Sequence, residues 1–220
     1  MSNQSPMIRY YLLFCNSTMM IGWARTFRVV FRNWSTLQDP QNPVCQQLLE
    51  PYTQLALWLS CLELLNAAMG VTRSKPHQVL LFAGARSSVE FLITPLLGDN
   101  YCAHVYHLYT VTFWSFGDMI RFGCFTLDNL VPQATLAKKV RYTVGPIMFP
   151  LGILGETLIV YEVARLTWHP FFLVATVLWP VFGIVLMRQL LKQRRRFWER
   201  LVVDSGSASG DASKAKIKAV

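Results

Sequence analysis

The sequence predicts an all-α integral membrane protein, a bundle of six transmembrane helices with both termini in the cytosol. Three observations indicate this class. Of the 220 residues, 53% are hydrophobic and only 15% are charged, and the hydrophobic residues form several long runs. Lysine and arginine gather in alternate loops. The runs take up most of the chain, so no separate soluble catalytic domain is expected.

Each run is about as long as a transmembrane helix, which needs about 20 mostly apolar residues. The first run lacks a small-residue cleavage site after it, so we interpret it as the first span and not as a signal peptide. The predicted spans are Tyr10–Val30, Leu48–Val71, Gln78–Leu97, Ala103–Leu127, Tyr142–Ala164 and Pro170–Leu190.

The orientation follows from the basic residues, because cytosolic loops carry an excess of lysine and arginine. The opposite loops carry few, and those few stand near acidic residues. The net charge of +9 therefore mostly reflects topology, and nucleic-acid binding is not expected because the aromatic residues lie within the spans. The basic side comprises Arg9, Arg73, Lys75, Lys138, Lys139, Arg141, Lys192, Arg194, Arg195, Arg196 and Arg200.

The tail at 201–220 is rich in Ser, Gly, Ala, Asp and Lys and poor in large apolar residues. Such a composition predicts disorder. Lys216 and Lys218 stand five and three places from the C-terminus, a spacing that resembles the dilysine retrieval signal of endoplasmic reticulum membrane proteins. That signal works in the cytosol, where the charge distribution already places this end, and it predicts residence in the endoplasmic reticulum membrane.

The cysteines and histidines do not form a motif. No CxxC occurs, so neither a metal site nor a disulfide framework is expected, and no cysteine is followed six residues later by arginine, which excludes the cysteine-phosphatase loop. The histidines stand at the edges of predicted spans, where their polar tips are expected to face the headgroups. These residues are Cys15, Cys45, Cys61, Cys102 and Cys124, and His77, His104, His107 and His169.

Glu156 lies in the middle of the fifth predicted span. A charge at mid-membrane costs roughly 2.5–3.5 kcal/mol on insertion scales, so such an acid usually faces the bundle interior and indicates a functional site. Glu63 in the second span is placed similarly. Neither acid has an opposite charge within helical reach, so each needs a partner from another span or must be partly protonated. Such a group can exchange protons near neutral pH.

Two further charge pairs lie inside spans. Arg86 and Glu90 are four residues apart in the third span, and Asp118 and Arg121 are three apart in the fourth. Each pair can meet along one helix face and partly neutralise itself. A buried polar clamp between helices and a role in substrate binding both stay open for them.

Six segments of the sequence match a known family in order: Tyr10–Trp23, Leu62–Ser74, Ala85–Arg86, Trp114–Phe122, Arg141–Tyr161 and Met187–Arg196. Together they resemble the 3-hydroxyacyl-CoA dehydratase family of the endoplasmic reticulum, also called the protein-tyrosine-phosphatase-like family. The resemblance implies a six-span bundle that removes water from a (3R)-3-hydroxyacyl-CoA to give the trans-2-enoyl-CoA, the third step of very-long-chain fatty acid elongation. It also implies no metal or organic cofactor, and as partners the condensing enzyme and the ketoacyl and enoyl reductases of the elongase complex.

The catalytic pair that the resemblance implies is a Tyr and a Glu seven residues apart, in a pattern like YPxGxxxE. Here the pattern reads FPLGILGE, so Glu156 matches and Phe149 replaces the tyrosine. Seven residues are nearly two helical turns, which puts both positions on one face about 10 Å apart. Dehydration takes a proton from C2 and delivers one to the C3 hydroxyl, and acid–base help is typically worth ~10²–10⁴ in rate.

Another hydroxyl could replace the missing one. Tyr109 and Ser115 in the fourth span and a water held by Glu156 stay open as candidates. Tyr142 is about 21 Å from position 156 along the helix and cannot serve the same carbons, and Tyr161 is rotated off the face of Glu156. Asp118 stands where the family usually has Glu, and it is expected to keep the pairing with Arg121.

Two functions are weighed. The first is a working dehydratase that is slowed or re-wired by Phe149 and uses Glu156 as its essential carboxylate, helped by Asp118 and Arg121. The second is a scaffold or regulatory subunit of the elongase complex. A transporter is less favoured because no internal repeat is seen. Pro146 and Pro150 break one helix, and a kink there would open space beside Glu156.

Overall fold

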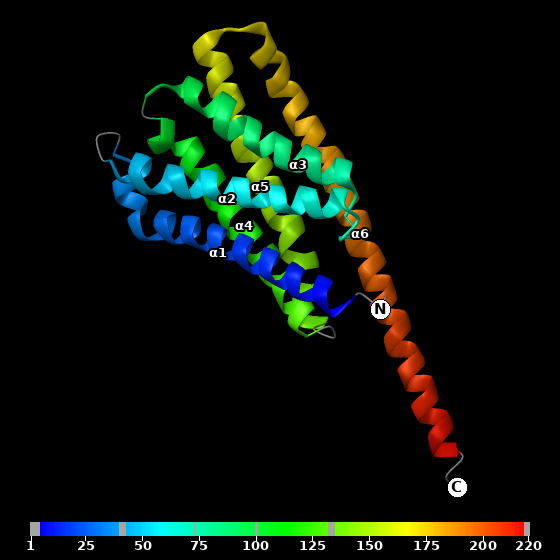
Figure 1. Cartoon of the computed structure of the whole chain (residues 1–220). Helices are drawn as coiled ribbons and strands as arrows, with labels where there is room; N and C mark the ends of the chain where they lie inside the picture. The colour runs from blue at the N-terminus through cyan, green and yellow to red at the C-terminus, as the bar shows by residue number, and fades with distance from the viewer. Residues whose placement is uncertain (1–4, 40–42, 73, 100, 132–134, 218–220) are drawn as a thin grey trace.

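The computed structural model describes residues 5–39, 43–72, 74–99, 101–131 and 135–217, with side chains as far as residue 199. Within these residues the fold is all-helical, without strands (Figure 1). Each predicted span coincides with a helix, so the all-α prediction is confirmed. The helices are α1 (Pro6–Leu37), α2 (Glu50–Ala68), α3 (Pro76–Ser88), α4 (Val105–Leu130), α5 (Thr135–Thr167) and α6 (Pro170–Ile217).

Short π- and 3₁₀-helices extend three of these helices. A π-helix (Cys45–Leu49) leads into α2, and a 3₁₀-helix (Tyr101–Ala103) leads into α4. A π-helix (Val89–Ile93) and a 3₁₀-helix (Thr94–Leu97) continue α3. Proline occupies the first turn of α1, α3 and α6, where its missing N–H costs no hydrogen bond.

Consecutive helices run in opposite directions. At one end of the bundle the start of α1 meets the end of α4, and the starts of α3 and α5 meet the later part of α6. At the other end the loop before α2 meets the loop before α4. The contacts are Arg9 Nε to the Asn129 carbonyl at 2.5 Å, Gln78 to Gln189 at 2.9 Å, the Tyr142–Phe197 ring stack at 4.5 Å, and Gln46 Nε2 to the Asp99 carbonyl at 3.1 Å.

Helix α4 lies at the centre, packed against α1 on one side and α5 on the other, and α5 packs against α6. Trp23, Trp114 and Phe122 are almost fully buried in this core. Gly155 allows α5 to approach α4 closely, because a Cβ at that position would lie 3.1 Å from the Thr110 Cα.

We expect Gly155→Ala to lower the free energy of unfolding by about 1–3 kcal/mol, because the added methyl group forces α4 and α5 apart. Denaturant unfolding in detergent micelles measures this change. Gly145→Ala is the matched control on the same helix, since a Cβ added there would meet no atom of the described residues within 4 Å. Equal stability of the two variants would show that the close contact is unimportant.

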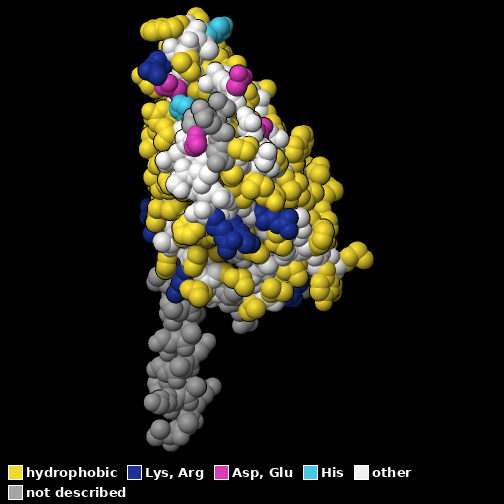
Figure 2. All heavy atoms as spheres, turned by 90° about the vertical axis from the view of Figure 1, so that its left-hand side faces the viewer, with side chains coloured by type: hydrophobic (Ala, Val, Ile, Leu, Met, Phe, Trp, Pro, Cys, Tyr) yellow, Lys and Arg dark blue, Asp and Glu magenta, His cyan; other side chains and the backbone are white. Residues whose placement is uncertain are grey.

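Three helical segments are long and apolar enough to cross a membrane: Pro76–Leu97, Thr135–Thr167 and Pro170–Glu199. Hydrophobic side chains cover much of the face shown in Figure 2, where charged side chains are few. Exposed apolar residues on long apolar helices indicate a membrane protein. Six spans and cytosolic termini stay a prediction.

Two of the sequence predictions concern residues that the structure describes only in part or not at all. Arg73 lies outside the described residues, as do the side chains from residue 200 on. The predicted disordered tail falls in this last part, where the α6 backbone is helical to Ile217.

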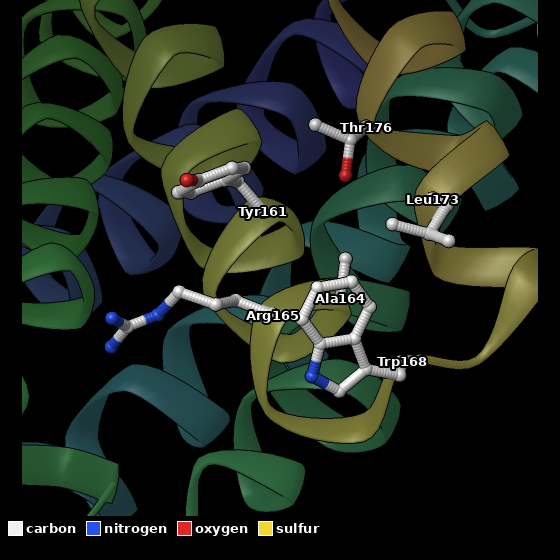
Figure 3. Close-up of a pocket in the computed structure, with 6 residues that line it drawn as sticks. All are labelled: Tyr161, Ala164, Arg165, Trp168, Leu173 and Thr176. Carbon is white, nitrogen blue, oxygen red and sulfur yellow. The ribbon is translucent and has the colours of Figure 1, made fainter.

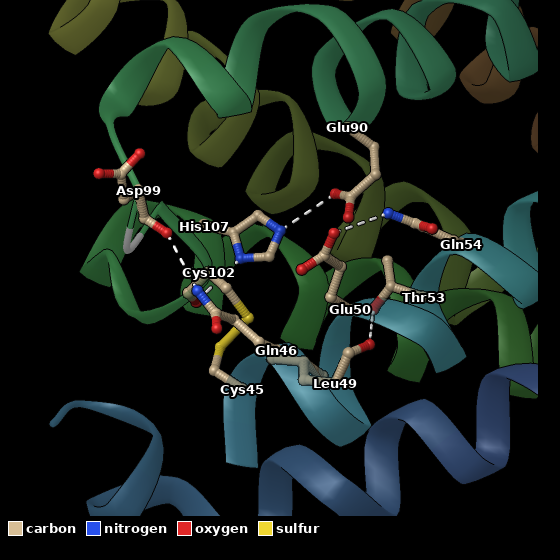
Figure 4. The surroundings of a disulfide bond; sticks show 10 residues. All are labelled: Cys45, Gln46, Leu49, Glu50, Thr53, Gln54, Glu90, Asp99, Cys102 and His107. Carbon is tan, nitrogen blue, oxygen red and sulfur yellow. Dashed lines mark hydrogen bonds and ion pairs between the residues drawn. A yellow bond between two sulfur atoms is a disulfide. The ribbon is translucent and has the colours of Figure 1, made fainter. Parts of the chain in front are cut away.

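The expectation that the cysteines form no disulfide is wrong. Cys45 and Cys102 form one, with a sequence separation of 57 residues (Figure 4). The spacing rules that we applied detect local motifs such as CxxC, whereas this bond joins two loops that the fold brings to the same end of the bundle. Both loops lie on the side that the charge distribution assigns away from the cytosol, and this shared side is the sequence signal that could have found the bond.

We expect a thiol reagent to modify three of the five cysteines when the protein is denatured without a reductant, because Cys15, Cys61 and Cys124 are free thiols. After reduction all five should react. Mass spectrometry of the modified peptides measures both counts. Modification of Cys45 and Cys102 before reduction would contradict the bond.

Candidate functional site

The side chain of Glu156 lies inside the bundle, with an exposed fraction of 3%. Its Oε1 accepts a hydrogen bond from Trp114 Nε1 at 2.9 Å, and its Oε2 accepts one from Trp179 Nε1 at 2.9 Å. The neighbouring glycines allow this geometry, because Gly152 faces the Trp114 ring and Gly155 faces Thr110. Both glycines lie on the α4-facing side of α5 and bring Trp114 within reach of the carboxylate.

Four of the other in-span charges form one chain across three helices. Arg86 of α3 pairs with Asp118 of α4, and Arg121 of α4 pairs with Glu63 of α2. Arg121 Nη1 also lies 3.7 Å from Asp118 Oδ1. The pairing of Asp118 with Arg121 is therefore confirmed, and Glu63 has the partner from another helix that it needed. Paired and hydrogen-bonded charges of this kind can be retained in an apolar interior.

The expected pairing of Arg86 with Glu90 is wrong, because each of them bonds to α4 instead. Glu90 pairs with His107, at 3.0 Å between Oε2 and Nε2. The chain changes from α- to π-helix at Val89, between the two residues, and this change alters the angular spacing on which the i, i+4 expectation depends.

The prediction that His107 faces the headgroups is also wrong, because its exposed fraction is only 1%. Its Nδ1 lies 3.1 Å from the Cys102 carbonyl oxygen, so the histidine connects Glu90 to the disulfide loop (Figure 4). Tyr101 packs edge-on against the His107 ring. Burial raises the pKa of the Tyr101 phenol, and its hydrogen bond to Glu50 acts in the same direction. This end of the bundle therefore holds a second polar cluster, separate from Glu156.

Aromatic rings connect the charge chain to both positions of the implied catalytic pair. The guanidinium carbon of Arg86 lies 5.4 Å from the centre of the Trp114 ring and 4.2 Å from that of Phe82. Trp114 in turn bonds to Glu156. Phe82 stacks on Phe149, with 5.9 Å between the ring centres. Phe149 thus packs toward α3, while Glu156 points toward α4 and α6.

The two side chains that could replace the missing tyrosine hydroxyl, Ser115 and Tyr109, both belong to α4. Ser115 is fully buried and donates to the Thr112 carbonyl at 3.1 Å, and Tyr109 packs against Phe113 with 4.5 Å between ring centres. In the part of the chain that the structure describes, Glu156 hydrogen-bonds to the two indoles and to neither hydroxyl. A replacement for the missing tyrosine hydroxyl therefore stays a prediction.

A cavity of about 290 Å³ opens between α5 and α6 (Figure 3). It begins near Thr176, one helical turn before Trp179 in the sequence, and ends at the α5–α6 turn. It does not include any predicted site residue. Among the described residues no group of three His, Cys, Asp or Glu side chains could hold a metal ion. The cavity is lined by Tyr161, Ala164, Arg165, Trp168, Leu173 and Thr176.

The fold and the site define an all-helical membrane protein with a buried carboxylate beside a chain of buried ion pairs. A family profile described as "Protein tyrosine phosphatase-like protein, PTPLA" matches residues 57–200, more than half of the chain. The chain belongs to this family, the family of very-long-chain 3-hydroxyacyl-CoA dehydratases. Its members are in general hydro-lyases of lipid metabolism. Comparison with curated proteins and with solved structures finds no match.

The matched region contains every site residue predicted from the sequence, from Glu63 to Glu156, and it also contains Trp179. The segment Tyr10–Trp23, which contributed to the resemblance, lies before it. Sequence reasoning did not identify Trp114 and Trp179 as partners of Glu156. Tryptophan in a predicted span is usually an interface anchor or a core residue, so its N–H gave no signal of this role.

Proposed function

We propose that the protein removes water from a (3R)-3-hydroxyacyl-CoA to give the trans-2-enoyl-CoA, the third step of very-long-chain fatty acid elongation. The observation that carries this proposal is Glu156, a carboxylate buried inside the bundle at the position of the family's Glu. Membership of the dehydratase family supports it. The reaction needs no metal or organic cofactor, because the CoA thioester itself makes the C2 proton acidic.

The chemistry requires a group that takes the C2 proton and a group that protonates the departing C3 hydroxyl. A carboxylate in a water-poor interior suits proton transfer, since the surroundings do not compete for the proton. The Arg86–Asp118 and Arg121–Glu63 pairs support the site by fixing α2, α3 and α4 around it.

Phe149 supports the alternative function, that of a scaffold or regulatory subunit. Its ring packs on Phe82, an apolar contact that supplies neither a proton nor a hydrogen bond. A protein with this substitution could serve as a scaffold or regulatory subunit, bound to the condensing enzyme and to the ketoacyl and enoyl reductases. We favour the enzyme because this chain has all four of Glu156, Asp118, Arg121 and Pro150. A protein that had lost the activity would have little reason to keep them.

We place the protein in the endoplasmic reticulum membrane with six spans and both termini in the cytosol. The disulfide supports this topology: Cys45 and Cys102 lie at the end opposite the basic loops, and disulfides persist in oxidising compartments such as the lumen of the endoplasmic reticulum. The dilysine-like Lys216 and Lys218 support the same location.

The test measures enoyl-CoA formation from a long-chain (3R)-3-hydroxyacyl-CoA by the protein in membranes. We expect slow turnover by the chain as it stands and a gain of about 10²–10⁴-fold for Phe149→Tyr, because the new phenol restores a proton donor. Phe82→Tyr, on the partner ring, is the control for a phenol placed elsewhere. Lack of turnover in both the natural chain and Phe149→Tyr would exclude the dehydratase and favour the scaffold.

A further inference from the structure

Two indole N–H groups converge on Glu156 from different helices. Trp114 comes from α4 and has an exposed fraction of 1%, and Trp179 comes from α6 and is partly buried. Each bonds to a different oxygen of the carboxylate, both at 2.9 Å. Three helices therefore fix the orientation of this one side chain.

The chemistry of these donors indicates which form of Glu156 they suit. An indole N–H can only donate a hydrogen bond, and an ionised carboxylate can accept on both oxygens. In a protonated carboxyl group, the oxygen that carries the proton is a weaker acceptor. One of the two hydrogen bonds from the indoles would therefore be weaker in that form. Each carboxylate oxygen has two lone pairs, and one on each remains free to receive a proton.

The ring of Trp114 is itself held in place. The Arg86 guanidinium lies over its face at 5.4 Å, a cation–π distance, and Arg86 in turn forms an ion pair with Asp118. The ion-pair chain thus reaches Glu156 through the indole of Trp114, without a direct bond between the charges.

We propose that Trp114 and Trp179 are positioning residues that hold Glu156 as the proton acceptor of the reaction. This inference rests on the proposed dehydration. Glu156 takes the C2 proton, the electron pair of the C2–H bond forms the C2–C3 double bond, and the C3–O bond breaks. The proton then passes from Glu156 to the departing hydroxide, which leaves as water, and the carboxylate is restored. One carboxylate serves both steps, so the reaction in this form does not require a tyrosine at position 149.

The test replaces each indole separately, as Trp114→Phe and Trp179→Phe, and measures kcat and KM. We expect kcat to fall about 10- to 100-fold in each variant, the loss that corresponds to a hydrogen bond to a charged group, while KM changes less than about threefold because the indoles do not bind the substrate. Trp179→His, which retains an N–H donor, should recover part of the loss. Trp23→Phe is the control: it removes another buried indole, which donates to Ser60 at 3.2 Å, and should leave kcat unchanged.

Infrared spectroscopy gives a readout that does not depend on turnover. The bands of Glu156 are identified by their loss in Glu156→Gln. We expect carboxylate bands that shift in Trp114→Phe and Trp179→Phe and not in Trp23→Phe. Unchanged kcat in both Phe variants, a loss confined to KM, or a protonated carboxyl band would overturn the inference. If the natural chain and Phe149→Tyr both lack turnover, the proposed function fails, and the infrared shifts still decide whether the indoles hold Glu156.

Discussion

Glu156→Gln is expected to reduce enoyl-CoA formation by about 10²–10⁴-fold. The amide has nearly the shape of the carboxylate, but it cannot take a proton, and its NH₂ group faces an indole N–H that also donates. The rate is measured with saturating and limiting substrate in membranes. The loss should appear in kcat and kcat/KM together, because the proton transfer occurs only in the transition state.

Glu162→Gln is the matched control for that experiment. Glu162 lies on the same helix, has an exposed fraction of 8%, and bonds to Arg165 instead of an indole. We expect its variant to keep the activity of the natural chain within a few-fold. Full activity in Glu156→Gln, or an equal loss in both variants, would show that the chemistry does not use Glu156.

Asp118→Ala is expected to lower the free energy of unfolding by about 3–5 kcal/mol, because it leaves the Arg86 guanidinium buried without its carboxylate. Only 11% of the Arg86 side chain is exposed, so water cannot replace the lost partner. Unfolding in mixed detergent micelles measures the change. Asp118→Glu, which keeps a carboxylate at this position, should keep most of the stability.

The control for this prediction is an ion pair in an exposed setting. Arg195 and Glu199 are 83% and 58% exposed in their side chains, and exposed i, i+4 pairs are worth about 0.3–0.5 kcal/mol. Glu199→Ala should therefore change stability much less than Asp118→Ala. A similar small change in both variants would show that the buried chain of ion pairs does not stabilise the bundle.

Much of the fold could be predicted because hydrophobic runs and charge placement are local properties of the sequence. The six predicted spans all fall on helices, and the acid in the fifth span turns inward, as the cost of a charge in lipid requires. The contact between Asp118 and Arg121 was also predictable, since it depends only on spacing along one helix.

The partners between helices could not be predicted in the same way. Whether Arg86 meets Glu90 or Asp118 depends on how α3 and α4 are rotated against each other, and hydrophobic periodicity does not fix that rotation. The disulfide and the Glu90–His107 pair depend on the same packing. The indoles on Glu156 were missed for a different reason, because a tryptophan in an apolar run has the same sequence signature whether or not its N–H has a partner.

The most direct test of the central claim is photo-crosslinking with a long-chain 3-hydroxyacyl-CoA analogue that carries a photoreactive group beside C3. If the reacting carbons lie next to Glu156, the label should appear on the segments around Trp114, Glu156 and Trp179, and excess unlabelled substrate should abolish it. Labelling confined to exposed residues such as Trp58 and Leu154, unaffected by competing substrate, would contradict the account.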